Sequence, residues 1–478
     1  MKTVIFGAGP AGLAAAYVLA RNGEAPVVLE KSDSVGGISR TVNYKGYYFD
    51  LGGHRFFTKF SEVQALWEEV LGEDFLLRPR LSRIYYDGKL FDYPLRATNA
   101  LRNLGIRESA HCMGSYARAR LRPRGEEASF RDWVSNRFGD RLFEIFFESY
   151  TEKVWGIPTS EIGAEWASQR IKNLDLGTAV RDALARPLRQ LRPGAGGGEV
   201  VTSLIEQFHY PRTGPGLMYD RMSEKTVGFG GQVNMQEEVV RIAHHAGRVT
   251  HTVTRSPDGT ERTWEGDWFI SSIPLTLLVL RMDPPPPPDV VEAARSLRFR
   301  HLLTIDLIVD HPDLFPDNWV YVHERSLQLG RVQNFKNWSP EMVPDPRRTS
   351  LGLEYFCFSD DPIWKMSTEE LVAFGSREIA HTSLTRGAPI LDGTVVRVPM
   401  AYPVYQRGYA EHVEKVVGWL RGFQNLQPVG RYGMFKYNNA DHSILTALLA
   451  VENQRGAHHD IWSVNTDTEY HEVRRDKG

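Results

Sequence analysis

The sequence predicts a protein of mixed α/β and α+β class, with a Rossmann-type domain, a helical subdomain and a mainly antiparallel β-sheet domain. Three observations predict it. A strand, glycine turn, helix and second strand fill the first 30 residues, helical spacing of apolar residues runs through 99–190, and short β-rich runs recur after residue 301. At 478 residues the chain is too long for one compact core, so two or three domains are expected.

The glycine motif GAGPAG at 7–12 ends the first apolar run and precedes a helix-like segment. A second apolar run over 26–29 leads to Glu30, which stands 18 residues after the third glycine. Glycines let a pyrophosphate approach the backbone, the helix N-terminus offers free N–H groups, and the acid can accept from a ribose hydroxyl. This pattern predicts a dinucleotide site at Gly7, Gly9, Gly12 and Glu30. A glycine turn in another kind of α/β protein is the alternative.

Two further glycine pairs indicate FAD rather than NAD. Gly36 and Gly37 are followed by Arg40, where the longer body of a flavin dinucleotide continues past the pyrophosphate. A second pair ends at Gly53, directly before His54, and lets backbone lie close to a flat ligand. A glutamate at the strand end, with no arginine nearby, argues against NADP at this site.

Composition limits the partners. The net charge of −2 argues against nucleic acid, and no run of 18 apolar residues predicts a membrane span. Cys112 and Cys357 match no metal spacing and are expected to be reduced thiols of a cytoplasmic protein. The pairs at 244–245 and 458–459 are histidines without further ligands, so no metal site is expected. The sequence indicates no particular oligomeric state.

The remaining segments are interpreted in chain order. We expect a helix at 61–75 that closes the first βαβ unit, a hairpin at 82–94, helices through 99–190 and a glycine-rich loop at 192–199. Strands within 227–240 and 268–274 are expected to return to the first sheet. A proline-rich crossing at 284–288 follows, and helices at 368–383 and 410–424 are expected among the later strands. The resulting division is a discontinuous FAD-binding domain (1–75, 225–280 and 425–470), a hairpin and helical subdomain (76–224) and an antiparallel-sheet substrate domain (281–424).

A turn over 430–443 precedes the last apolar helix. Asp441 is the predicted N-cap of that helix. If the helix N-terminus faces the pyrimidine edge of a flavin, its dipole stabilises the negative charge of the reduced form. An ordinary capped helix is the alternative.

Separated motifs resemble those of the UDP-galactopyranose mutases and the amino-oxidase-like flavoproteins around them. They are Gly52-Gly53-His54, Tyr93-Pro94, Trp166 to Arg170, Trp319-Val320-Tyr321 with Arg331, Asn337-Trp338-Ser339-Pro340, Tyr402-Pro403, Tyr437 and the turn from Gly430-Arg431. The resemblance spans nearly the whole chain. It implies that His54 lies against the isoalloxazine and that Arg170 and Arg331 grip the diphosphate of a nucleotide sugar. Guanidinium forks and tyrosine hydroxyls suit such a group, although each residue taken singly is more often a surface ion pair or a core-edge aromatic.

The predicted site follows from these motifs. The catalytic residues are His54, Arg170 and Arg331. The cofactor-binding residues are Gly7, Gly9, Gly12, Glu30, Gly36, Gly37, Arg40, Gly53, Val239, Gly430, Arg431, Asn439, Asp441 and Ser443. The substrate-binding residues are Tyr93, Trp155, Tyr321, Trp338, Tyr402 and Tyr437.

Two functions stay open. The resemblance implies a pyranose/furanose mutase acting on a nucleotide-diphosphate sugar, in which the N5 atom of reduced FAD is the nucleophile and no net redox occurs. The alternative is an FAD-dependent oxidase or dehydrogenase acting on a sugar or another natural-product intermediate. Trp338 replaces a tyrosine of fungal-type mutases, and Arg96 also departs from their pattern, which leaves the sugar and the reaction open. NAD(P)H is a possible external reductant.

Overall fold

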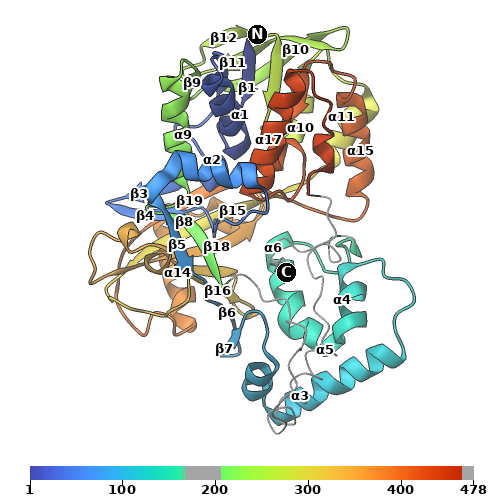
Figure 1. The fold of residues 1–478 in the computed structure, drawn as a ribbon. Helices are drawn as coiled ribbons and strands as arrows, with labels where there is room; N and C mark the ends of the chain where they lie inside the picture. The colour runs from blue at the N-terminus through green and yellow to red at the C-terminus, as the bar shows by residue number, and fades with distance from the viewer. Residues whose placement is uncertain (165, 167–205, 466–478) are drawn as a thin grey trace, which may run out of the picture.

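The computed structural model describes residues 1–164, 166 and 206–465 (Figure 1). Its first layer is a five-stranded parallel sheet of order β20-β13-β1-β2-β9. The strands are β1 (Thr3–Phe6), β2 (Val27–Leu29), β9 (Gln232–Asn234), β13 (Trp268–Ser271) and β20 (Leu426–Pro428). Strands β9 and β13 lie in segments predicted to return to this sheet, whereas β20 was not predicted. Parallel pairing of segments so distant in sequence confirms the Rossmann-type part of the fold class.

Helices cover this sheet. Helix α1 (Pro10–Arg21) follows the glycine turn and packs against α17 (Ala440–Gln454) and α9 (Gly216–Gly228). Beside them lies a sheet of order β12-β11-β10-β14. Its strands are β10 (Glu238–His245), β11 (Arg248–Arg255), β12 (Glu261–Glu265) and β14 (Met282–Asp283), and short helix α10 (Leu275–Leu280) precedes β14.

The proline run does not form the predicted crossing between domains. Helix α11 (Pro288–Ser296) begins inside the run, because proline has a suitable φ for the first helical turn and needs no N–H partner there. This helix packs against α15 (Tyr409–Leu420) beside the first sheet. The chain leaves only after α11, where β15 (Phe299–Val309) begins.

The largest layer is a seven-stranded sheet of order β19-β15-β18-β17-β16-β6-β7. Its other strands are β6 (Ser82–Tyr86), β7 (Lys89–Asp92), β16 (Trp319–Val322), β17 (Arg331–Asn334), β18 (Thr349–Cys357) and β19 (Ile390–Pro403). All neighbours are antiparallel except β16 and β6, which confirms a mainly antiparallel sheet. The predicted hairpin is present as β6 and β7, but it extends this sheet. Helix α14 (Thr368–His381) packs on β15 and β19.

Shorter elements connect the layers. Helix α2 (Ser61–Leu71) does not close a βαβ unit, because the strand after it, β5 (Phe75–Pro79), pairs with β8 (Gln207–Pro211) in a separate ribbon. A second ribbon joins β3 (Thr41–Tyr44) to β4 (Tyr47–Asp50). The short helices are α12 (Phe335–Trp338), α13 (Pro362–Lys365) and α16 (Gly430–Gly433).

The helical part forms a lobe at the end of the molecule away from the parallel sheet (Figure 1). It contains α3 (Ala97–Leu121), α4 (Phe130–Phe138), α5 (Asp140–Phe143), a π-helical turn (Glu144–Glu148) and α6 (Ser149–Trp155). Gly105, at φ 78°, kinks α3. Across the described ranges, no helix combines the length and apolarity needed to cross a bilayer.

Candidate active site

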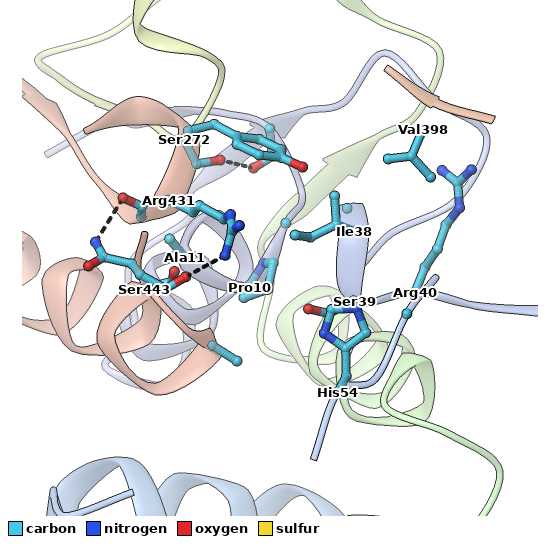
Figure 2. A pocket seen from close by; sticks show the side chains of 18 of the residues that line it. Pro10, Ala11, Ile38, Ser39, Arg40, His54, Ser272, Val398, Arg431 and Ser443 are labelled. Atoms are coloured by element: carbon cyan, nitrogen blue, oxygen red, sulfur yellow. Dashed lines mark hydrogen bonds between the residues drawn. The ribbon is translucent and has the colours of Figure 1, made fainter. Parts of the chain in front are cut away.

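A cavity of about 460 Å³ runs from the parallel sheet to the seven-stranded sheet. Its wall comes from the glycine turn, the segments at 37–40 and 52–57, strands β16, β17 and β19, and the turn before α17. Figure 2 shows Arg431 and Ser443 on one side of it and Arg40 and Val398 on the other. Segments distant in sequence therefore meet at one elongated site.

The glycine turn leaves room for a ligand. A Cβ on Gly12 would lie 1.9 Å from the carbonyl oxygen of Gly7, so this glycine lets α1 pack on the turn. A Cβ on Gly9 would meet nothing within 4 Å, and Gly9 lines the cavity at the N-terminus of α1. No side chain caps that N-terminus. The open N–H groups fit the pyrophosphate of a dinucleotide.

Glu30 organises the loops at this end of the cavity. Its carboxylate accepts hydrogen bonds from the backbone N–H of Ala8 (2.8 Å) and from the N–H (2.9 Å) and hydroxyl (2.8 Å) of Ser32. A carboxylate has about four lone-pair positions, so these three bonds leave one for a ribose hydroxyl. Glu30 thus serves the turn as well as any bound nucleotide.

His54 lies in the wall that the second glycine pair shapes. Its Nε2 is 3.0 Å from the carbonyl oxygen of Leu51. Burial, aided by the positive charges of Arg331 and Arg431, lowers the pKa of His54 to about 4. The ring is therefore neutral near pH 7. A Cβ on Gly53 would lie 3.0 Å from the Gln333 amide nitrogen, so glycine lets this segment pack closely on β17.

Arg431 is a cation of the cavity wall with buried guanidinium nitrogens. Its Cζ lies 4.0 Å from the ring centre of Tyr437 and 4.9 Å from that of Tyr402. Nη1 donates to the carbonyl of Asn438 at 3.4 Å, whereas Nε and Nη2 are buried and have no hydrogen-bond partner among the described residues. Unsatisfied buried donors are costly, so an acceptor of a bound group fits this position.

Arg331 is held by a buried carboxylate. Its Nε and Nη2 donate to Oε2 of Glu354 at 3.0 and 2.5 Å, and Gln333 donates to the other oxygen at 2.6 Å. The pair orients the guanidinium at the cavity wall, where its Cζ is 5.9 Å from the ring centre of Tyr321. The ring of Tyr93 lies 5.1 Å from that of Tyr321. An arginine and two phenols therefore share this end of the cavity.

The cavity contains most of the predicted site. The predicted residues that line it are His54, Arg331, Gly7, Gly9, Glu30, Gly37, Arg40, Gly53, Val239, Gly430, Arg431, Asn439, Asp441, Ser443, Tyr93, Tyr321, Trp338, Tyr402 and Tyr437. Gly12 and Gly36 lie behind the turns that they shape, and Trp155 is buried behind Tyr402 and Tyr437. Arg170 lies outside the described residues. Trp338 is mainly a core residue, because it is 1% exposed and its indole N–H is already bonded to the carbonyl of Asn318 at 2.8 Å.

The predicted cap of α17 is wrong by two residues. Asn439 has extended backbone angles and is the N-cap, and its N–H donates to Nδ1 of His442 at 3.3 Å. Asp441 is already inside the first turn, buried beside Nδ1 of His442 at 3.2 Å. The sequence alone did not separate these positions because Asn and Asp are both strong N-caps.

Several wall residues were not predicted. Ser272 lines the cavity (Figure 2), and its hydroxyl donates to the carbonyl of Phe6 at 2.9 Å, which supports the glycine turn. Arg55 and the β19 segment 397–400 also line the cavity. The β19 segment carries no local motif, and only the order of strands in the large sheet brings it here.

Comparisons with known proteins agree with this architecture. Residues 10–384 match the family model of the flavin containing amine oxidoreductases. Coproporphyrinogen III oxidase of Mycobacterium tuberculosis is 25% identical over 440 residues, which cover 86% of this chain and 89% of that protein. An L-amino-acid oxidase of Crotalus adamanteus is 53% identical, but over 63 residues only, 13% of this chain and 12% of that protein.

Solved structures extend the similarity to nearly the whole chain. A reduced UDP-galactopyranose mutase superposes with a TM-score of 0.79 at 23% identity, covering 98% of this chain and 100% of that one. A putrescine oxidase triple mutant gives a TM-score of 0.59 at 15% identity, covering 95% and 99%. At these identities the two structures establish the fold. Because the family model spans most of the sequence, the protein belongs to the flavin containing amine oxidoreductases, and its cofactor is FAD.

Proposed function

We propose that this flavoenzyme acts on a nucleotide-diphosphate sugar as a pyranose/furanose mutase, without net redox. The observation that carries the proposal is the cationic and phenolic wall beyond the glycine turn. Arg331 and Arg431 line it together with Tyr93, Tyr402 and Tyr437. Guanidinium and phenol groups donate hydrogen bonds to phosphate oxygens.

Each group has a distinct part in this proposal. FAD, when bound, supplies the nucleophilic N5 atom of its reduced form. Arg331, oriented by Glu354, binds the departing diphosphate, and Arg170 supplies a second guanidinium. Neutral His54 in the cavity wall would lie against the flavin and would add no positive charge there. The N–H groups at the start of α17 favour negative charge on the reduced cofactor.

A net oxidoreductase is the second candidate. The similarity to coproporphyrinogen III oxidase over most of the chain favours it. In that case the same cavity would take a substrate that loses hydride to FAD, and oxygen or NAD(P)+ would accept the electrons. The arginines would then bind carboxylates in place of a diphosphate.

One experiment distinguishes the mutase from the oxidoreductase. FAD-loaded protein is reduced with dithionite under anaerobic conditions and incubated with UDP- and TDP-hexoses, and the products are analysed for a furanose isomer. Isomer formation by the reduced protein alone supports the mutase. Absence of any isomer, together with steady oxygen or NAD(P)+ consumption by the oxidised protein, would replace it with the oxidoreductase.

A further inference from the structure

Helix α3 carries a charge unlike that of the whole chain. Residues 96–124 contain seven arginines and one acidic residue, whereas the complete sequence has a net charge of −2. Glu108 is paired with Arg141, and Arg124 with Asp132 and Asp140. The six arginines that are exposed and have no ion pair with a described residue are Arg96, Arg102, Arg107, Arg118, Arg120 and Arg122.

The exposed face of α3 also carries an apolar stripe. Ile106, Ala110, Met113, Ala117 and Leu121 recur at spacings of three and four residues, so they lie along one side of the helix. All five are exposed, with Ile106 at 90% and Leu121 at 82%. The other side of the helix packs against α4 and α5. The stripe is therefore additional to the face that α3 buries in the lobe.

The position of α3 makes this face accessible. Figure 1 shows α3 at the far end of the helical lobe, away from the parallel sheet. On a helix of 3.6 residues per turn, Arg107, Arg118 and Arg122 follow one edge of the stripe and Arg120 lies at the other edge. Apolar side chains bordered by arginines are the pattern of a helix that lies in a membrane interface.

We propose that the outer face of α3 docks on an anionic lipid bilayer. Ile106, Met113 and Leu121 would enter the interface below the headgroups, and the flanking arginines would bind the lipid phosphates and carboxylates. This is a peripheral contact that requires no spanning helix.

Charge and side-chain type favour a bilayer over other occupants. A second copy of α3 would bring like charges together, which opposes self-association. Segment 167–205 contains six lysines and arginines against three acidic residues, so its charge does not complement the face either. Nucleic acid would satisfy the arginines, but single strands are bound with stacked aromatic rings, and Tyr116, the aromatic residue of α3, is half-buried and lies outside the stripe.

The test uses FAD-loaded, full-length protein and vesicle flotation. Vesicles of phosphatidylcholine with about 30% phosphatidylserine are compared with pure phosphatidylcholine at about 0.1 M salt. Binding is expected to the anionic vesicles only and to be lost at about 1 M salt. Arg107→Gln/Arg118→Gln should lower the partition coefficient about 25-fold, since each arginine near such a surface contributes about fivefold.

Matched controls separate this face from general charge and hydrophobicity. Arg377→Gln/Arg421→Gln removes the same charge from exposed positions elsewhere and should leave binding unchanged. Ile106→Ser/Leu121→Ser should also weaken binding, whereas Val227→Ser/Leu391→Ser, at other exposed apolar positions, should not. Retained FAD and an unchanged melting temperature show that each variant is folded.

Three results would overturn the proposal. The first is no binding of wild-type protein to the anionic vesicles. The second is equal loss of binding in the α3 variants and their controls. The third is a wild-type dimer that Ile106→Ser/Leu121→Ser converts to monomer, without vesicle binding, because the face would then be a self-association surface.

Discussion

Replacing Arg331 by methionine breaks its buried ion pair with Glu354. Glu354 is 1% exposed and the Arg331 side chain 17% exposed, so little water can replace the lost partner. Removing one member of such a pair costs about 3–5 kcal/mol because the other charge stays buried. Arg331→Met should lower the free energy of unfolding by this amount, with Gln333 as the remaining donor to Glu354.

The double variant Arg331→Met/Glu354→Gln separates stability from binding. It leaves neither charge buried, and neutral replacement of a whole pair is often close to neutral in stability, so urea unfolding should recover most of the loss. Binding of UDP, measured by calorimetry on FAD-loaded protein, should stay weaker than in wild type by about 2–5 kcal/mol, which is about thirtyfold or more.

Two outcomes would refute this reasoning. If the double variant is no more stable than Arg331→Met, the buried carboxylate is not the cause of the instability. If the double variant binds UDP as wild type does, Arg331 does not contact the diphosphate, and its task is to hold the sheet beside the cavity.

Five other substitutions test separate parts of the site. Gly12→Ala should destabilise the fold, because its Cβ would lie 1.9 Å from a carbonyl oxygen, whereas Gly9→Ala should preserve the melting temperature of the apoprotein and weaken FAD binding in a fluorescence titration. Arg431→Met should lower the affinity for FAD or UDP by about 1–3 kcal/mol in titrations, because the variant lacks the two buried donors, Nε and Nη2, that a bound group would accept from. The pKa of His54 is about 4 in the folded protein, below its value in the unfolded chain. Its contribution to the free energy of unfolding is therefore complete above about pH 6.5 and is lost as the pH falls towards 4. Unfolding curves of His54→Gln, measured across this range, should lack this part of the pH dependence. Arg170→Ala should weaken UDP binding by about 2–5 kcal/mol without changing the melting temperature, and unchanged binding would remove Arg170 from the site.

The sequence predicted best the features that depend on residues close together in the chain. The glycine turn, Glu30 and the start of α1 form a local unit whose turn, packing and hydrogen bonds involve neighbours in the chain. The segment at 268–271 could be predicted to return to that sheet because its apolar run is short and bounded by turn residues.

Tertiary packing decided what the sequence could not. The hairpin of β6 and β7 looks the same whether it stands alone or extends a sheet, and only the partner β16 distinguishes the two. Trp155 and Trp338 belong to aromatic-rich segments in which core and ligand-facing positions have the same composition. Their burial became clear only with the neighbours that cover them, Tyr402 and Tyr437 for the first and Trp319 for the second.

The two ends of the cavity differ in the charge that they offer. Glu30, Glu237 and Glu238 line the end beside the parallel sheet. Glu237 is paired with Arg262 and Glu238 with Arg281, so Glu30 is the carboxylate that suits a ribose hydroxyl. Arg331 and Arg431 line the other parts of the wall. Between these two parts of the wall, the N-terminus of α1 and the glycine turn are the groups that we expect to bind the pyrophosphate of FAD. Arg331 therefore lies beyond the anion that the cofactor brings. Glu354 balances its charge, and the second anionic ligand that we propose for this part of the wall is the diphosphate of a nucleotide sugar.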